Sequence, residues 1–318
     1  MAKAEINVTY KINKSTGYRE RIVKDFRINK YAYFMAMPVL LYYIIFHYAP
    51  MYGIMIAFKD FRPALGIWRS SWIGFQYFKD FLGSYYFWRL IKNTLMINVY
   101  QLIFGFPAPI IFALLLNELN NKVFKRTVQT VTYLPYFISV IVICGIIADF
   151  TDRNGVINDI IAIFGGERST MLMRSELFRT IFVSSDIWTN LGWGTIVYLA
   201  ALSNIDPKLY EAITIDGGGR WEKAIHITLP GIVPTIIILL ILRIGNSMSL
   251  GWEKIILLYN PLTYETADVI SSFVYRKGIL EADYGYSAAV GLFNSIINFI
   301  LLIMANKISR KVNETSLW

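Results

Sequence analysis

Long apolar runs alternate with polar, basic or aromatic stretches along the chain. Six runs contain about 20 residues, enough for a helix to cross a hydrocarbon core of about 30 Å. Proline lies inside several of these runs, which membrane helices tolerate. The runs cover residues 31–58, 93–116, 128–150, 179–201, 231–257 and 287–305. The pattern predicts an all-α integral membrane protein with about six transmembrane helices.

Composition agrees with this interpretation. Hydrophobic residues make up 55% of the 318 positions and charged residues only 17%, with mean hydropathy +0.46, and a soluble chain of this length needs more polar surface. The single cysteine, Cys144, lies inside an apolar run, so no intrachain disulfide can form. The first thirty residues are polar and basic, and the run after them is long enough to span, so no cleavable signal peptide is apparent.

The distribution of charge predicts the orientation in the membrane. With an even number of spans both tails share one side, and the tails and loops of that side hold 17 Lys and Arg against nine Asp and Glu. The rest of the chain holds 14 and 13, so the basic side is expected to be cytoplasmic. We therefore predict cytoplasmic tails at 1–30 and 307–318, a membrane domain at 31–306 with a cytoplasmic loop at 202–230, and an aromatic interfacial segment on the outer face at 59–92.

The loop at residues 202–230 is too polar to cross a membrane. Asp206 followed by Pro207 predicts a helix start, because aspartate caps the first free N–H groups and proline has none to lose. Three glycines from Gly217 predict the end of that helix and a tight turn. A second short helix is expected next, and Pro230 marks the entry into the following apolar run. Two short amphipathic helices around a glycine turn form a compact protrusion suited to contact with another protein.

This loop also carries a motif. It consists of Glu-Ala, a glycine six positions after the glutamate, and Ile-x-Leu-Pro at the start of the next apolar run. In this motif the chain resembles the coupling loop of binding-protein-dependent ABC importer permeases. The matching positions are Glu211, Ala212, Gly217, Ile227, Leu229 and Pro230.

The resemblance extends beyond the loop. Asp216 with Gly217, and Trp221, fit the sugar-importing branch, whereas Ile213 and Gly218 replace alanines that the family more often carries. The stretches 42–60 and 258–270 resemble the branch that takes up complex oligosaccharides or polysaccharide fragments. The chain is thus similar to a maltose-permease-like carbohydrate permease over most of its length.

The resemblance implies a multi-pass permease subunit of an ATP-driven importer in the bacterial cytoplasmic membrane. It implies a heterodimer with a second homologous permease, two cytoplasmic ATPase subunits that bind ATP and Mg²⁺, and an extracytoplasmic sugar-binding protein. It also implies that the loop couples this chain to the ATPases. The coupling residues would be Glu211, Ala212, Asp216, Gly217, Leu229 and Pro230.

Chemistry-bearing motifs are absent from the sequence. No Gly-x-x-x-x-Gly-Lys-[Ser/Thr] is present, so ATP phosphates cannot be held in the P-loop manner. His47 and His226 have no partners at metal-ligand spacing. We therefore expect no metal, no directly bound cofactor and no enzymatic activity, and the basic charge follows the membrane topology, so we expect no nucleic-acid binding.

Polar side chains inside the predicted spans are the candidates for the substrate path, because hydrocarbon penalises them and they tend to face a cavity. Arg243 lies 13 residues after Pro230, or about 20 Å along a helix, which places its guanidinium near mid-membrane. Aromatic faces with amide and guanidinium donors suit a sugar, whose ring has apolar faces and hydroxyl edges. The candidates on the two spans joined by the loop are Asn190, Trp193, Arg243, Asn246 and Ser247.

Interhelical hydrogen bonding is the alternative role for the asparagines, and packing or interface anchoring for the tryptophans. Further polar residues in spans are Asn98, Gln101, Asn294 and Asn298. The alternative function is an ATP-independent secondary transporter or channel. It is disfavoured because no span carries an Asp/Glu proton relay and because the loop motif would then be a coincidence. A membrane-embedded enzyme ranks third, since no catalytic constellation is present.

Overall fold

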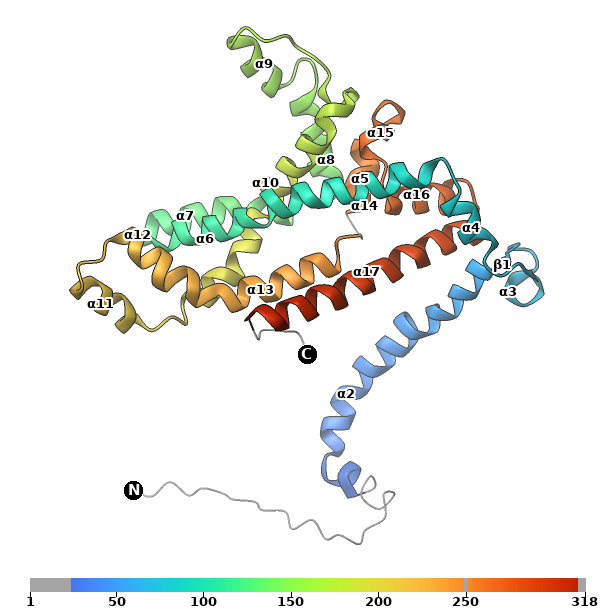
Figure 1. Ribbon diagram of the computed structural model, residues 1–318, viewed down its shortest axis with the longest axis horizontal. Coiled ribbons are helices and arrows are strands. Elements are labelled where there is room, and N and C mark those ends of the chain that lie inside the picture. Colours follow the sequence, from blue (N-terminus) through green and yellow to red (C-terminus); the bar gives the residue numbers. More distant parts are fainter. Residues whose placement is uncertain (1–23, 249–250, 314–318) are drawn as a thin grey trace. The chain divides into compact units, whose positions relative to one another are not determined.

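The computed structural model describes residues 24–248 and 251–313, so residues 1–23 and 314–318 of the predicted tails lie outside the described part of the chain. The described residues are mostly helical (Figure 1). The described residues divide into two compact units, on either side of the boundary between Met55 and Ile56.

The first unit is dominated by one helical segment. Helix α2 (Lys30–Tyr43) continues into the π-helix η1 (Ile44–Tyr48) and the 3₁₀-helix η2 (Ala49–Phe58), which crosses the boundary between the units. The helix type changes next to Pro50, which has no N–H to give to the usual ladder. The segment Lys30–Phe58 is long and apolar enough to cross a membrane and matches the first predicted run.

The second unit begins with the aromatic segment. Strand β1 (Lys59–Asp60) pairs antiparallel with β2 (Ser71–Trp72), with Lys59 opposite Trp72. Helix α3 (Gly66–Arg69) lies between the strands and α4 (Gln76–Leu82) follows them. The Phe58 ring contacts the rings of Trp72, Phe75 and Phe78, so this segment forms a small aromatic cluster.

The second predicted run forms one helix of 32 residues, Tyr86–Asn117. It consists of α5 (Tyr86–Tyr100), the π-helix η3 (Gln101–Gly105) and α6 (Pro107–Asn117). The helix begins before the predicted residue 93, because Arg89 and Asn93 pair with buried groups and so extend it. The wide π turn, closed by Phe106 N donating to Gln101 O at 2.8 Å, carries the chain into Pro107 without a break.

The third predicted run, 128–150, was expected as one span and is instead bent. Helix α7 (Lys122–Tyr133) and the 3₁₀-helix η4 (Leu134–Phe137) are followed, after a bend of 103°, by the segment Val140–Ile163. Pro135 lies just before the bend, and the Ser139 hydroxyl caps the new helix by accepting from Val142 N. The new segment consists of α8 (Val140–Thr151) and α9 (Val156–Ile163).

The 3₁₀-helix η5 (Met171–Met173) leads to α10 (Ser175–Leu202), the helix around which the second unit packs. Helix α10 packs on α6, α7 and α5. It also packs on α13 (Leu229–Gly245), the helix that follows the loop. Gly192 lets α10 approach α7 closely, since a Cβ there would lie 2.3 Å from the Thr132 carbonyl oxygen.

The loop between α10 and α13 departs from the prediction in one respect. Helix α11 (Pro207–Ile215) forms as expected. The second short helix is not separate, because α12 (Arg220–Lys223), the π-helix η6 (Ala224–Thr228) and α13 form one 26-residue helix, Arg220–Gly245. Figure 1 shows α11 projecting from the end of the helix bundle.

The fifth predicted run, 231–257, is also not one helix. Helix α13 ends at Gly245, and α14 (Trp252–Leu258) is a separate helix that packs on α8 and α16 (Ile270–Tyr275). The remaining elements are η7 (Pro261–Thr263), α15 (Tyr264–Ala267), the π-helix η8 (Arg276–Leu280) and α17 (Tyr284–Asn313). Helices α13 and α17 lie side by side (Figure 1).

Among the described residues, four helices are long and apolar enough to cross a membrane, or five if the bent pair at residues 122–163 counts as one span. Helix α10 has 28 residues, about 42 Å at 1.5 Å per residue, which is long enough to span. It is less apolar than these four helices because it carries polar side chains, several of which line a cavity. The count of six spans therefore stays a prediction.

Candidate functional site

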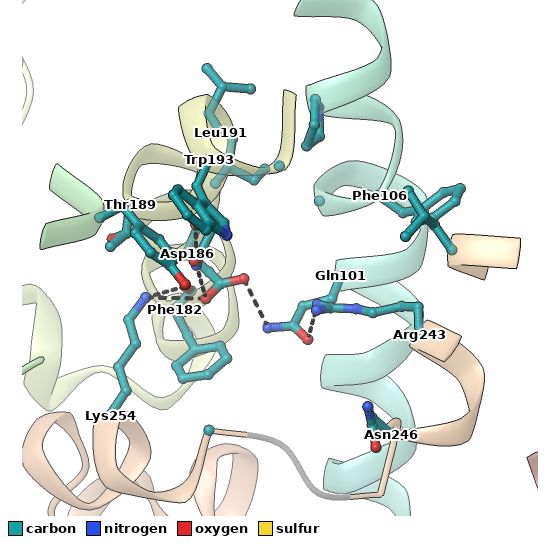
Figure 2. A pocket seen from close by; sticks show the side chains of 18 of the residues that line it. Gln101, Phe106, Phe182, Asp186, Thr189, Leu191, Trp193, Arg243, Asn246 and Lys254 are labelled. Carbon is teal, nitrogen blue, oxygen red and sulfur yellow. Dashed lines mark hydrogen bonds and ion pairs between the residues drawn. The ribbon is translucent and has the colours of Figure 1, made fainter. Parts of the chain in front are cut away.

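A cavity of about 730 Å³ lies inside the second unit. Its walls come from α5, η3, α6, η4, α8, α10, α13 and α14 and from the residues that follow α13 (Figure 2). All five candidates for the substrate path line this one cavity, although α10 and α13 are separated by the loop. They are Asn190, Trp193, Arg243, Asn246 and Ser247.

One wall of the cavity is aromatic. Trp193 on α10 stacks on Tyr136 of η4, with ring centroids 4.5 Å apart and planes inclined by 3°. Phe137 adds an edge contact to Trp193 at 6.1 Å. The sequence pattern did not single out Tyr136, because it lies next to Pro135 in a run that was expected to be a straight span. Trp193 lines the cavity and stays 45% exposed, so Tyr136 and the other neighbours leave part of its ring uncovered.

A chain of polar side chains crosses the cavity (Figure 2). Arg243 Nη2 donates to Gln101 Oε1 at 2.7 Å, and Gln101 Nε2 donates to Asp186 Oδ2 at 3.4 Å. Asp186 Oδ1 lies 3.9 Å from Lys254 Nζ, which closes the chain on α14. We call these four residues the polar relay. It connects α13, η3, α10 and α14, and it gives Arg243, which the sequence predicts near mid-membrane, a hydrogen-bond partner.

Asp186 and Lys254 were not among the candidates. Lys254 Nζ also donates to the Phe182 carbonyl at 3.3 Å, and Asn190 Nδ2 donates to both Asp186 O and Asp186 Oδ1 at 3.0 Å. The available signal was a charged residue inside each of two apolar runs, with Asp186 one helical turn before Asn190. A single carboxylate held by a lysine and two amides does not form a proton relay.

The ionisable side chains of the cavity lining are balanced. The lining contains two cations, Arg243 and Lys254, and two anions, Asp186 and Glu253, and the remaining lining consists of amides, hydroxyls, aromatic rings and aliphatic groups. This surface offers hydrogen-bond donors and acceptors together with apolar faces, which are the two features of a sugar ring. Among the described residues, no group of His, Cys, Asp and Glu is arranged to hold a metal ion.

Helix α11 in the loop is capped at both ends. Asp206 Oδ1 accepts from Lys208 N at 2.9 Å and caps α11. At the other end Gly217 has φ +82, Gly217 N donates to Thr214 O and Gly218 N donates to Ile213 O at 2.8 Å, the hydrogen-bond pattern of a Schellman cap. The sequence signals for both ends of this helix are thus confirmed.

The six candidate coupling residues are all exposed, and they form two groups. One group belongs to α11 and its C-terminal turn, and the other begins α13. The first group is Glu211, Ala212, Asp216 and Gly217, and the second is Leu229 and Pro230. Tyr210 and Thr228 connect the groups through a hydroxyl–hydroxyl hydrogen bond of 3.1 Å. Glu211 also lines a shallow hollow together with Tyr210, Thr214, Ile215 and Lys223.

A second polar cluster lies away from the cavity, around the fully buried Asp268. Its carboxylate pairs with Arg89 at 3.1 Å and with Arg276 at 2.7 Å, and its backbone carbonyl accepts from Asn93. Burial alone would lower the pKa of Arg276, but the hydrogen bond and charge of Asp268 raise it overall. Burial raises the pKa of the neighbouring Tyr259 to about 12. This cluster joins α5 to α16, and the sequence pattern did not predict it.

Membrane-length helices, a polar cavity between them and an exposed loop joining two cavity walls together define a membrane permease. Residues 105–314 match the family described as binding-protein-dependent transport system inner membrane component, and this chain belongs to that family.

Relatives with similar length support the assignment. The chain is 47% identical to Protein LplB of Bacillus subtilis (strain 168), over 91% of this chain and 92% of that protein. It is 41% identical to the polygalacturonan/rhamnogalacturonan transport system permease protein YteP of the same organism, over 94% of both chains.

Among solved structures, the chain matches a bacterial ABC transporter involved in the import of the acidic polysaccharide alginate. The TM-score is 0.86 at 42% identity, covering 92% of this chain and 99% of that one. A structure of the alginate transporter in complex with alginate pentasaccharide-bound periplasmic protein gives the same TM-score at 41% identity, covering 93% of this chain and 100% of that one.

Proposed function

We propose that this chain is a transmembrane subunit of an ATP-driven importer that moves oligosaccharides or polysaccharide fragments across the bacterial cytoplasmic membrane. The observation that carries the proposal is the cavity, because its aromatic wall and polar relay lie between α10 and α13, the two helices that the exposed loop joins. The named carbohydrate transporters among the relatives support the substrate class.

The sugar path follows from the cavity lining. A sugar ring stacks on the uncovered part of the Trp193 ring, which is held by Tyr136. Its hydroxyls exchange water for Asn190, Asn246 and the free donors of Arg243. These contacts are few and weak, as release on the far side requires. Because the cavity charges are balanced, the cavity itself suits neutral and charged sugars alike.

ATP-driven movement enters through the loop. In the proposed assembly two cytoplasmic ATPase subunits grip the α11 protrusion, a second homologous permease completes the pathway, and an extracytoplasmic binding protein delivers the sugar. Closure of the ATPases moves the loop, and α10 and α13 move with it, so that access to the cavity alternates between the two sides of the membrane. Both termini are cytoplasmic in this arrangement.

Trp193→Ala tests the sugar path, and Trp188→Ala is its matched control. The two tryptophans lie on α10 and are similarly exposed, at 45% and 44%, but only Trp193 lines the cavity. Loss of an aromatic contact of about 1 kcal/mol weakens sugar affinity about fivefold, so Trp193→Ala should raise the KM of uptake. Assembly with the ATPase should be retained.

Uptake and melting temperature are measured side by side for both variants. Equal losses of uptake in the two variants, or a loss that follows the melting temperature, would place the sugar path elsewhere. Purification distinguishes the importer from the ATP-independent alternative, because an importer subunit co-purifies with an ATPase and a secondary transporter or channel does not.

A further inference from the structure

Met248 lies between α13 and α14, so its backbone N–H and C=O groups are not part of a helix. Its side chain is buried in a cluster with Phe81, Leu90 and Phe273. Backbone N–H and C=O groups in a membrane protein must find partners inside the protein, because lipid offers none. The partners of Met248 N and O therefore decide whether Met248 keeps one backbone conformation.

Two asparagines of α17 supply these partners. Met248 N donates to Asn298 Oδ1 at 2.9 Å, and Met248 O accepts from Asn294 Nδ2 at 3.1 Å. The two asparagines are four residues apart, so they lie on one face of α17. One amide supplies an acceptor and the other a donor, and together they replace the hydrogen bonds that a continuous helix would make.

The same face of α17 also fixes the end of α13. Leu302, four residues after Asn298, packs so closely on Gly245 that a Cβ there would lie 2.5 Å from Leu302 Cδ1. Helix α17 therefore contacts the last residue of α13, Gly245, and the third residue beyond its end, Met248. We call Asn294, Asn298 and Leu302 the α17 clasp.

The environment of Asn294 indicates that this residue is required for the hydrogen bond that its Nδ2 donates to Met248 O. Asn294 is only 9% exposed, and within the described residues its Oδ1 has no hydrogen-bond partner. A buried oxygen without a partner is unfavourable, and a leucine of similar size would avoid it. Packing alone therefore does not explain an asparagine here, whereas the bond to Met248 O does.

The clasp acts on the cavity through the two residues before Met248. Asn246 and Ser247 line the cavity, and the next peptide in the chain is the clasped one. We propose that Asn294 and Asn298 are positioning residues of the permease: they hold the non-helical peptide at Met248 and thereby set Asn246 and Ser247 toward the transport cavity. The link to transport rests on the proposed function, but the effect on position 246 does not.

Asn298→Leu and Asn294→Leu test the clasp, with Asn306→Leu as the control because it places the same change at another buried asparagine of α17. In full-length protein with Cys144→Ser and Asn246→Cys, the only thiol lies at position 246, and its rate of modification by a maleimide reports the orientation of that residue. Loss of one hydrogen bond shifts the balance between the held and the released peptide by about fivefold. We expect a change of this size in the maleimide rate for the two clasp variants and none for Asn306→Leu.

Sugar uptake, measured in protein that keeps Asn246, provides the functional readout. The clasp variants should raise the KM for sugar more than they lower the maximal rate, and Asn294→Gln, which keeps a donor, should restore part of the effect. Unchanged maleimide rates, or the same change in Asn306→Leu, would overturn the proposal. If a leucine variant does not accumulate, Asn298→Ser is measured in the same way. A changed maleimide rate without a role for Trp193 would keep the clasp and refute the proposed sugar path.

Discussion

Gly192→Ala is the sharpest perturbation that the structure offers. Gly192 is buried in the middle of α10, where this helix crosses α7. A Cβ on Gly192 would lie 2.3 Å from Thr132 O and 2.6 Å from Tyr133 Cδ1. Ordinary van der Waals contact begins near 3.4 Å, and the Thr132 carbonyl belongs to the backbone, so the two helices must separate by about 1 Å.

The magnitude follows from two opposing terms. Inserting one methyl group into a packed interior costs about 1–3 kcal/mol, whereas alanine is favoured over glycine inside a helix by about 1 kcal/mol. Gly145→Ala isolates the second term, because Gly145 lies inside α8 and a Cβ there meets nothing within 4 Å. We expect Gly145→Ala to be neutral or stabilising and Gly192→Ala to lower the melting temperature by several degrees.

Cys144 makes the measurement direct. It is the only cysteine of the chain and is buried, so a thiol-reactive dye reports thermal unfolding of the purified protein. Because Trp193 follows Gly192 and stacks on Tyr136 next to α7, Gly192→Ala should also reduce sugar uptake. Equal melting temperatures for the two alanine variants would show that α10 and α7 do not approach as closely as the structure has them, and the geometry of the aromatic wall would lose its support.

Four further predictions concern the loop, the topology and the two polar clusters. Gly217→Val should abolish sugar uptake and co-purification of the ATPase while the protein still reaches the membrane, because a φ of +82 is strained for valine. Gly217→Asn should keep both uptake and co-purification, because asparagine tolerates this φ. Glu211→Lys should abolish uptake in the same assay. In a Cys144→Ser background, cysteines at positions 208 and 310 should stay unlabelled by an impermeant reagent outside intact cells, and labelling of either would refute the cytoplasmic assignment. Lys254→Met should destabilise the protein by leaving Asp186 without its cation, and the double variant with Asp186→Leu should melt at a higher temperature than either single variant. The pKa of Tyr259 is raised to about 12, against an ordinary 10.0. Its neutral form therefore stabilises the fold fully below pH 10, and this contribution is lost as the pH rises through 12. In an alkaline unfolding series, Tyr259→Phe should lose less stability between these pH values than the unchanged protein.

Features that depend on residues near in sequence could be predicted. The first helical segment, Lys30–Phe58, follows the apolar run at 31–58, because hydropathy alone decides that a run this long favours lipid. Both ends of α11 follow from Asp206 and Gly217, since a cap acts within a few residues of the helix end. The five cavity residues came from polarity within the spans, which hydrocarbon makes informative.

Features that depend on distant partners could not be predicted. Met248, which follows the end of α13, is held by Asn294 and Asn298, which lie 46 and 50 residues later in the chain. Asp186 pairs with Lys254 on another helix, and Asp268 pairs with Arg89, which lies 179 residues away in the sequence. Hydropathy gives no information on which polar groups meet, so the bend before Val140, the break between α13 and α14 and both polar clusters had to come from the structure.

The continuity of the helices on each side of the loop has a mechanical consequence. Helix α10 runs without a break from the loop to Trp193, and the helix Arg220–Gly245 runs from the loop to Arg243, its π turn passing Pro230 without interrupting it. In the proposed mechanism, a displacement at the loop is therefore carried along both helices to the cavity walls that they form. Helix α13 ends at Gly245, residues 246–248 are not helical, and α14 packs on α8 and α16 instead of continuing α13. If the loop moves as proposed, Arg243 moves with it while Lys254 on α14 stays with α8 and α16, and the polar relay between Arg243 and Lys254 is the contact that this movement would stretch or break.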